Sequence, residues 1–489
     1  MESQKKESQN LPGSKLGGPK KGIIVAVVLI LIAAGGLGGY EFYKSSASGV
    51  TITVWGAGSA GGEQSAFNHS LASFEQAYPN ITVQDSPAAT LGNLPTVAHA
   101  GTAPNVVRLS SDQAGLFYSA GLVLNMSKYL NKSFTSQYTK GTIADWTSGG
   151  TLYGIPVNTN GIGLYYNKQL VPTPPTNTYQ MIMDAKNVSD MGSSYVGLPY
   201  ALGADYGYRF AAWLPAFNGE LFNSSFYPML NSTNDTAALS FVWNWTVQYH
   251  IDKLGLSTVA DEQALFESGK AAFILDGPWD QSTYQNALGK NLGVTAIPFD
   301  NATGKWPMPL WGSQGYAITV PQASGATSAQ TWASVQFIKW MTNYSSQLAL
   351  FNKAGDFPSL NSVGAYISVH NNSDPLISGW VAQEQHTQFF PNYPQMGYYW
   401  SAFHAGATDL AQNSTTVSVS DATKMIEASI IQSLQSNNLP YSSPAMNYLY
   451  GAESISIGHF VNEITLDQTY VFAPFQSDVS NAGSGGYRA

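Results

Sequence analysis

The stretch TITVWGAGSAGGEQSAFNHSLASFEQAYPNITV, residues 51–83, decides the fold class. Residues 51–55 are mostly apolar and β-branched and predict a buried strand. The glycine-rich run 56–62 predicts a flexible loop. Residues 63–78 carry apolar side chains at helical spacing, and 81–84 predict a second strand. A strand, a loop, a helix and a strand in this order predict an α/β fold with a largely parallel sheet.

The same alternation continues along the chain, with no visible internal repeat. The sequence predicts further strands over residues 105–109, 270–275 and 315–320, and helices over 111–120, 237–250, 264–272, 331–354 and 421–435. Ligands of such sheets bind beyond the carboxyl ends of the strands. We therefore expect the functional residues in the loops that follow the strands.

Length and composition bound what the protein can be. The 489 residues exceed one compact core, so two or more lobes are expected. Charged residues make up only 10% of the chain, against about 25% in an average soluble protein. The net charge of −9 argues against nucleic acid as the main partner. The absence of cysteine excludes disulfides and thiolate chemistry.

The N-terminus predicts a membrane segment. Residues 22–40 carry no charge and would span about 28 Å as a helix. Five lysines precede this run and only Lys44 follows it closely. This asymmetry predicts a cytoplasmic basic leader over 1–21, a single-pass anchor over 22–43 and a polar linker over 44–50. A cleaved prepilin-like leader is the alternative reading, and both stay open.

The part after residue 44 is expected to lie outside the cell. It keeps 15 basic and 27 acidic residues, a net charge of −12. Asn-x-Ser/Thr acceptors support this location and predict a glycosylated, archaeal-type cell-surface protein. The thirteen acceptors are Asn68, Asn80, Asn125, Asn131, Asn187, Asn223, Asn231, Asn234, Asn244, Asn301, Asn343, Asn371 and Asn413.

Motifs of common enzymes are absent from the sequence. There is no phosphate-binding GxxxxGK[ST] loop and no GxSxG nucleophile turn. The seven histidines form no HExxH pair, so we expect neither a metal nor a cofactor. Two scattered carboxylates could still meet across a cleft, as in a glycosidase.

Aromatic residues in loops are the most informative chemistry in the chain. They stand beside glycine and proline in the segments GADYGYR, DGPWD, LWGSQGY and PQMGYYW. Sugar rings have apolar faces and polar edges, so aromatic rings stack on the faces while polar side chains bind the hydroxyl groups. An acidic, aromatic-rich surface therefore favours a neutral polyol as ligand.

The order of five segments resembles the maltose-binding protein family, the family-1 extracellular solute-binding proteins of ABC importers. The segments are TITVWGAGSAGGEQSAFNHSLASFEQAYPNITV (51–83), AGTAPNVVRLSSDQAGLFYSAGLVLNMSKYL (100–130), GTLYGIPVNTNGIGLYYNKQLVPTPPTNTYQMI (150–182), FESGKAAFILDGPWD (266–280) and FFPNYPQMGYYWSAF (389–403). The resemblance covers residues 51–435 in unbroken order.

The resemblance implies a two-lobed, periplasmic-binding-protein-like (type II) fold with a hinged cleft. The chain would cross between lobes near residues 157–161, 310–315 and 357–361. The implied domains are lobe 1, made of 51–157 plus 316–358, and lobe 2, made of 161–310 plus 361–436. Residues 437–489 exceed the family's usual end, so their role stays open.

The resemblance also implies ligand-binding positions. They are Ser59, Glu63, Ser111, Asp112, Asn160, Asp205, Tyr206, Tyr208, Asp276, Trp279, Gly312, Ser313, Gln314, Trp400 and His404. Glu63 and Asp112 have an alternative role as acids at helix N-termini. Asn160 stands where the family's maltose binder has Glu, and His404 where it has Arg. We therefore expect a smaller or different sugar.

The implied function is capture of an extracellular mono- or oligosaccharide by a monomer and its delivery to ABC permease subunits with a separate ATPase, with no bond broken. Three alternatives stay open. They are a surface glycosidase, a binder of a non-sugar solute such as a peptide or polyamine, and a structural surface-layer protein.

Overall fold

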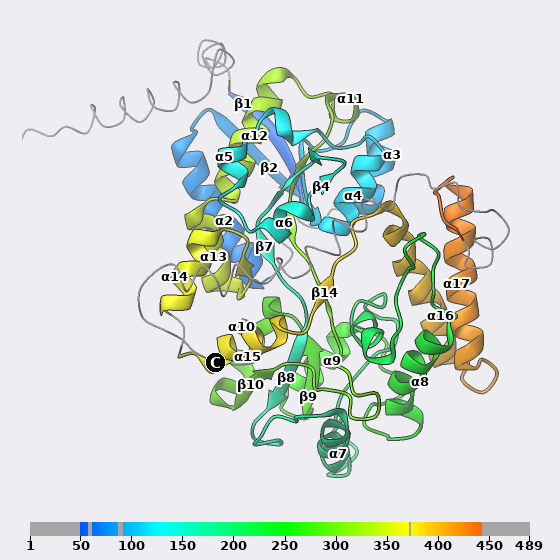
Figure 1. The fold of residues 1–489 in the computed structure, drawn as a ribbon. Helices are drawn as coiled ribbons and strands as arrows, with labels where there is room; N and C mark the ends of the chain where they lie inside the picture. The colour runs from blue at the N-terminus through cyan, green and yellow to red at the C-terminus, as the bar shows by residue number, and fades with distance from the viewer. Residues whose placement is uncertain (1–48, 57–60, 87–90, 371–372, 443–489) are drawn as a thin grey trace, which may run out of the picture. The chain divides into compact units, whose positions relative to one another are not determined.

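The computed structural model describes residues 49–56, 61–86, 91–370 and 373–442. The chain divides into residues 1–50 and 51–489, and the description below concerns the second part together with Val50, the first residue of β1 (Figure 1). The predicted leader and anchor, Ser59, Asn371 and most of the C-terminal extension lie outside the described residues. In the described ranges, no helix is long and apolar enough to cross a bilayer.

Two separate sheets organise this unit. The five-stranded sheet has the order β2-β1-β3-β12-β6, and the three-stranded sheet has the order β10-β8-β9. Their strands are β1 (Val50–Trp55), β2 (Ile81–Ser86), β3 (Val106–Ser110), β6 (Ile155–Pro156), β8 (Gly163–Asn167), β9 (Phe273–Asp276), β10 (Leu292–Thr295) and β12 (Gln314–Ile318). The predicted opening strand, helix and strand are thus confirmed.

The prediction of a largely parallel sheet was only partly confirmed. Strands β1 and β3 are parallel, but β12 runs antiparallel to both β3 and β6, and β8 runs antiparallel to both β9 and β10. The reason lies in the path of the chain, because β12 enters its sheet from the other one. Gln314 at the start of β12 pairs with Ser110 at the end of β3, so the returning strand must run in the opposite direction.

Short ribbons join the segments that we predicted as crossings. Strand β7 (Asn158–Thr159) pairs with β13 (Phe357–Pro358), and Asn160 forms a bridge with Gly312. Strand β11 (Leu310–Trp311) pairs with β14 (Gln388–Phe389). Figure 1 shows β7 and β14 in the region between the two sheets. The lobe boundaries themselves stay a prediction. A further ribbon joins β4 (Thr147–Ser148) and β5 (Thr151–Leu152).

Helices cover both sheets. The α-helices are α2 (Gly61–Ala77), α3 (Leu94–His99), α4 (Ser111–Ser119), α5 (Lys132–Thr135), α6 (Lys140–Ala144), α7 (Thr178–Ser189), α8 (Thr233–Val247), α9 (Val259–Glu267), α10 (Gln281–Leu288), α11 (Pro321–Ser324), α12 (Ser328–Met341), α13 (Tyr344–Ala354), α14 (Asn361–His370), α15 (Pro375–Glu384), α16 (Tyr399–Gln412) and α17 (Val419–Ser436). The 3-10 helices are η1 (Leu91–Asn93), η2 (Met126–Lys128), η3 (Phe210–Trp213), η4 (Pro215–Phe217), η5 (Pro278–Asp280), η6 (Gly289–Asn291) and η7 (Pro394–Tyr398).

Two predicted helices needed correction. The single helix over 331–354 is two helices, α12 and α13, because the side chain of Asn343 caps the start of α13 by accepting from the Ser346 backbone N–H. The helix predicted over 264–272 is α9, which begins earlier at a capping box between Thr258 and Asp261. It ends at Glu267, two residues before Gly269, whose φ is +72°.

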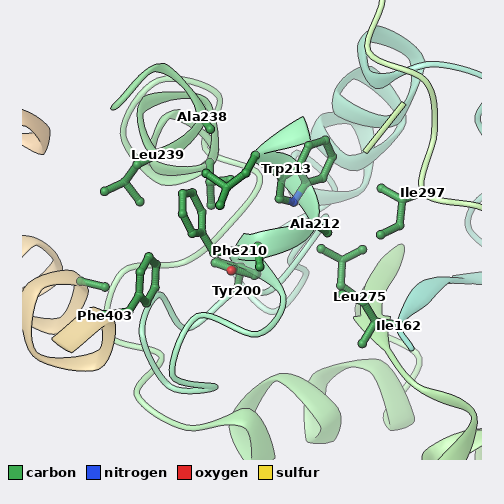
Figure 2. Close-up of a cluster of buried hydrophobic side chains, with 14 of the residues drawn as sticks. Ile162, Tyr200, Phe210, Ala212, Trp213, Ala238, Leu239, Leu275, Ile297 and Phe403 are labelled. Atoms are coloured by element: carbon green, nitrogen blue, oxygen red, sulfur yellow. The ribbon is translucent and has the colours of Figure 1, made fainter. Parts of the chain in front are cut away.

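A large aromatic core joins the three-stranded sheet to helices α8, α16 and α17 (Figure 2). Phe210 stacks on Phe403 with ring centroids 4.8 Å apart, and Trp213 meets Trp245 edge to face at 5.2 Å. All four rings are buried. This packing fixes the segment that immediately precedes Phe210, which carries several of the predicted site residues.

Candidate functional site

A cavity of about 820 Å³ is lined by residues that follow strands of both sheets. Its size lies within the roughly 300–1,000 Å³ of small-molecule sites. The lining residues are Gly61, Gly62, Glu63, Ser110, Asp112, Gln113, Asn158, Asn160, Asp205, Tyr206, Tyr208, Trp279, Asp280, Thr283, Gly312, Ser313, Gln314, Phe390 and Trp400. They include eleven of the fifteen predicted positions. Whether these side chains bind a ligand stays a prediction.

The turn from β3 into α4 supplies Asp112. Its carboxylate is buried and accepts hydrogen bonds from the Ser110 hydroxyl at 2.5 Å and from the Trp400 indole N–H at 2.9 Å. Burial raises the pKa of Asp112, and these two bonds partly offset the rise. Trp400 and Asp112 were predicted separately as site residues, and the structure shows that a hydrogen bond joins them. The neighbouring Ser111 is buried and does not line the cavity.

Glu63, in the first turn of α2, is held by a buried arginine that the sequence analysis missed. The two guanidinium nitrogens of Arg108 donate to its two carboxylate oxygens at 3.0 and 2.6 Å. Arg108 lies in the middle of β3, between apolar residues. The sequence pattern there indicates a strand and gives no sign that the arginine has a partner. The geometry is a bidentate ion pair, so the negative charge of Glu63 is compensated inside the protein.

The crossing segments meet at a second missed residue, Asp356. The Asn158 amide donates to Asp356 Oδ2 at 3.0 Å and the Asn160 amide donates to Oδ1 at 2.7 Å. The Asn160 side-chain oxygen in turn accepts from the Phe357 backbone N–H at 3.1 Å. The predicted ligand residue Asn160 thus also ties the first crossing to the third. Only the folded chain brings Asp356 here, from nearly 200 residues away.

The second crossing is held by another buried carboxylate. Ser313 donates its hydroxyl to Asp145 at 2.8 Å and accepts from the Trp146 indole N–H at 3.0 Å. Burial raises the pKa of Asp145 to about 8, and the Ser313 hydrogen bond partly offsets this rise. Gly312 and Ser313 line the cavity as buried residues, whereas Gln314 is partly exposed there.

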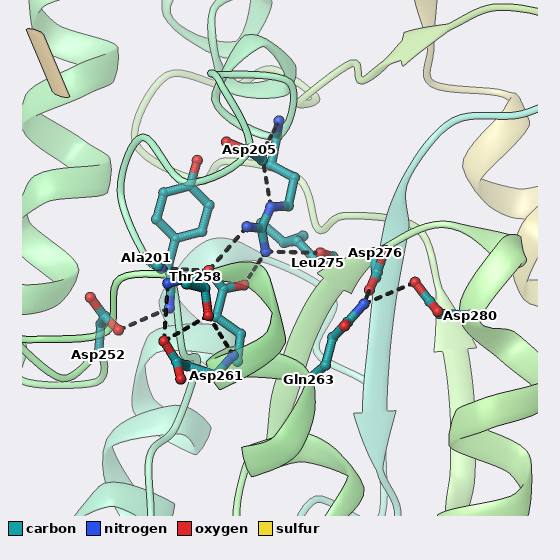
Figure 3. A network of polar contacts seen from close by, with 12 residues as sticks. Ala201, Asp205, Asp252, Thr258, Asp261, Gln263, Leu275, Asp276 and Asp280 are labelled. Atoms are coloured by element: carbon teal, nitrogen blue, oxygen red, sulfur yellow. Dashed lines mark hydrogen bonds and ion pairs between the residues drawn. The ribbon is translucent and has the colours of Figure 1, made fainter. Parts of the chain in front are cut away.

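The segment GADYGYR lines the cavity because an ion-pair network holds its backbone (Figure 3). Asp205 accepts from the backbone N–H groups of Gly207 and Arg209, at 3.1 and 2.7 Å, and from Arg209 Nε at 2.8 Å. Arg209 also pairs with the fully buried Glu262. Gly207 has a φ of +91°, and a Cβ there would lie 2.4 Å from the Tyr399 hydroxyl.

Tyr206 is the exposed aromatic ring of this segment. Its side chain is 49% exposed, and its backbone φ is +60°, a costly conformation for a non-glycine residue. The ring stacks on His404 with centroids 4.5 Å apart. His404 bonds the Gly203 carbonyl through Nδ1 and does not itself line the cavity. His404 therefore contacts Tyr206 and not the cavity, and its direct contact with a ligand stays a prediction.

The segment after β9 places an aromatic side chain at the surface of the cavity. Trp279 lines the cavity, and its centroid lies 6.4 Å from that of Tyr208. A Cβ on Gly277 would fall 2.2 Å from the indole, so the ring lies against bare backbone. Trp311 and Tyr399, which also stood beside glycine in the sequence, are buried in the core.

Asp280 lines the cavity, whereas the predicted residue Asp276 does not. Asp276 does not line the cavity, since its carboxylate accepts from Tyr284, Gln263 and the Gly277 backbone N–H. Asp280 does line it and accepts from the same Gln263 amide at 2.9 Å. Burial and the adjacent Asp276 charge raise the pKa of Asp280 above its usual range.

The polar groups can donate and accept hydrogen bonds, and the aromatic rings can stack, but no group of three or more metal-ligating side chains exists in the described ranges. This set of side chains can stack a ligand against flat aromatic rings and can bind the hydroxyl groups at the edges of the ligand.

A family model described as bacterial extracellular solute-binding protein matches residues 70–379. Among curated proteins, the chain is 24% identical over 342 residues to the maltotriose-binding protein of Pyrococcus abyssi, covering 69% of this chain and 72% of that protein. It is 24% identical over 400 residues to the galactooligosaccharide-binding protein of Bacillus subtilis, covering 78% and 89%. It is 26% identical over 343 residues to a maltooligosaccharide ABC transporter solute-binding lipoprotein of Streptococcus pneumoniae, covering 68% and 78%.

Solved structures match the fold. The maltose/maltodextrin-binding domain of Bdellovibrio bacteriovorus, bound to maltotriose, superposes with a TM-score of 0.72 at 25% identity, covering 79% of this chain and all of that one. The maltose-maltodextrin binding protein of Alicyclobacillus acidocaldarius superposes with a TM-score of 0.66 at 26% identity, covering 78% of this chain and all of that one. The chain therefore has the α/β fold of periplasmic binding proteins, as predicted.

Proposed function

The chain belongs to the bacterial extracellular solute-binding protein family, which is not enzymatic, and from that premise we propose that it captures a maltodextrin-type oligosaccharide and delivers it to an ABC transporter. The single observation that carries the proposal is the cavity wall. Trp279 follows the three-stranded sheet, Asp112 follows the five-stranded sheet, and Trp400 is bonded to Asp112. Aromatic faces and carboxylate edges together suit a pyranose.

The proposed mechanism is capture by closure. Side chains that follow both sheets line one cavity, so a ligand that contacts both would stabilise the arrangement in which they face each other. The paired crossing segments, held by Asp356 and Asn160, are the proposed hinge. A micromolar Kd corresponds to about 8 kcal/mol, which a few stacked rings and several hydroxyl hydrogen bonds supply.

A thermal-shift titration of the full-length protein tests this function. Maltotriose at about 100 times its Kd is expected to add about 2.7 kcal/mol to the free energy of unfolding and to raise the Tm. A galactooligosaccharide and glucose serve as comparisons of linkage and length. If no sugar in the set shifts the Tm, the proposed ligand class is wrong.

A cationic solute such as a polyamine is the second candidate. Asp112 and Asp280 line the cavity, and neither forms a salt bridge with a described lysine, arginine or histidine. Two such carboxylates would suit an extended diamine. Spermidine belongs in the same titration, and a shift with spermidine but not with maltotriose would favour this candidate.

We propose further that the protein acts outside the cell as a monomer, tethered by residues 22–43 and glycosylated. Neither anchoring nor glycosylation follows from the family. Support for glycosylation comes from the surface position of eight acceptors. The exposed acceptors are Asn68, Asn80, Asn131, Asn187, Asn231, Asn234, Asn301 and Asn413. A tether would raise the concentration of the protein near the transporter.

A further inference from the structure

The charges around the cavity are of one sign. Four carboxylates line it, those of Glu63, Asp112, Asp205 and Asp280. Within the described part of the chain, no lysine, arginine or histidine lines it. The formal charge of the lining is therefore negative wherever these acids are ionised.

The two nearby arginines do not reverse this sign. Arg108 is buried and binds both oxygens of Glu63, and Arg209 is buried and is shared between Asp205 and Glu262. Each guanidinium group thus forms an ion pair with at least one carboxylate, and neither arginine lines the cavity. Among the residues that the structure describes, none at the surface of the cavity supplies a cation that could pair with a bound anion.

Asp112 and Asp280 carry the remaining charge once they are ionised, since burial raises the pKa of both above the usual range. The side chains that donate hydrogen bonds to these acids are neutral, namely Ser110 and Trp400 for Asp112 and Gln263 for Asp280, and Asp280 also lies beside the Asp276 carboxyl group. One acid follows the five-stranded sheet and the other follows the three-stranded sheet, so a ligand that spans the cavity meets a carboxylate on each side.

We infer that the cavity selects its ligand by charge: it accepts neutral and amino-substituted oligosaccharides and rejects those that carry carboxylates, sulfates or phosphates. This inference rests on the proposed function and adds the substrate class. Like charges without a counter-ion repel, and an acid that is buried without a partner is costly. Uronic-acid oligomers, sulfated sugars and sugar phosphates are therefore excluded, whereas an amine gains an ion pair.

The test compares three ligands of one shape. They are maltotriose, the derivative with all three C6 hydroxymethyl groups oxidised to carboxylates, and the derivative with amino groups at all three C6 positions. Isothermal titration calorimetry of the full-length protein at pH 7.5 is expected to give a Kd for the acid at least 100-fold weaker than for maltotriose. The amine is expected to bind within tenfold of maltotriose or more tightly.

Comparing the amine with the acid separates the effect of charge on the Kd from the effect of size, because both derivatives are altered at the same three C6 positions. The double variant Asp112→Asn/Asp280→Asn is expected to narrow the ratio of acid Kd to maltotriose Kd at least tenfold, even if both ligands bind more weakly. Asp190→Asn, in the exposed pair with Lys186, is the control and should leave the ratio unchanged.

A Kd for the acid within tenfold of the Kd for maltotriose would overturn the inference and leave the proposed function intact. Equal weakening of the acid and the amine would overturn it as well, because size and not charge would then decide. If maltotriose itself does not bind, the proposed function fails and the inference falls with it.

Discussion

Replacing Trp279 by alanine is expected to weaken maltotriose binding by about 30- to 150-fold. The indole lines the cavity beside Tyr208 and lies against the backbone of Gly277. Burial and stacking of such a ring contribute about 2–3 kcal/mol, and each 1.4 kcal/mol changes the Kd tenfold. The Kd from calorimetric titration checks this expectation.

The matched control for this variant is Trp306→Ala. Trp306 is also half-buried and stacks on His386, with centroids 3.7 Å apart, but it does not line the cavity. Its loss should leave the Kd within twofold of the wild-type value. Gly277→Ala supplies a second variant, because the added methyl group would displace the indole without removing it. An unchanged Kd in Trp279→Ala would show that this ring is not part of the binding surface.

Replacing Arg209 by methionine is expected to lower the free energy of unfolding by about 3–5 kcal/mol at pH 8. The change leaves Glu262, which is fully buried, as a charge without its partner, and it removes the bond from Arg209 Nε to Asp205. Urea denaturation measures the loss. Lys186→Met is the control, because that exposed ion pair is worth under about 1 kcal/mol.

The size of the Arg209 effect should depend on pH. Burial raises the pKa of Glu262 to about 7, and Arg209 holds it below the value that burial alone would give. Without the arginine, the folded-state pKa rises further, so folding favours the protonated acid and stability falls as the pH rises through that value. The loss at pH 5 should therefore be smaller than the loss at pH 8. A loss below 1 kcal/mol at both values would mean that the network does not stabilise the fold.

Individual helices and strands could be predicted from the sequence, because apolar periodicity and helix caps depend only on residues that are near one another in the chain. The opening strand, helix and strand, and the amphipathic helix α17, follow from apolar spacing alone. The break between α12 and α13 was missed because the apolar spacing continues through it, whereas the cap of Asn343 shows only in the structure.

The strand directions and the partners of the site residues could not be read in this way. Strand β12 is antiparallel to β3 because the chain returns from the other sheet, which no local pattern records. Arg108 and Asp356 were missed for the same reason. Their partners Glu63 and Asn160 lie about 45 and 196 residues away, and a buried ion pair looks like an isolated charge in a sequence.

Predicted positions and cavity positions agree at Asp112, the second residue after β3, and at Trp279, the third residue after β9. They disagree at Asp276, Ser111 and His404, whose side chains point to protein partners or into the interior. Asp280 and Phe390 were overlooked, although each stands only a few residues from a predicted position or within a quoted segment.

The most direct measurement of the central claim is hydrogen–deuterium exchange of the full-length protein with and without saturating maltotriose. The proposed capture requires that one ligand contacts the wall after β3 and the wall after β9 at the same time. Amides of residues 110–113 and 279–283 are therefore both expected to exchange more slowly with the sugar present. Unchanged exchange in both segments, or protection of only one of them, would contradict capture between the two sheets.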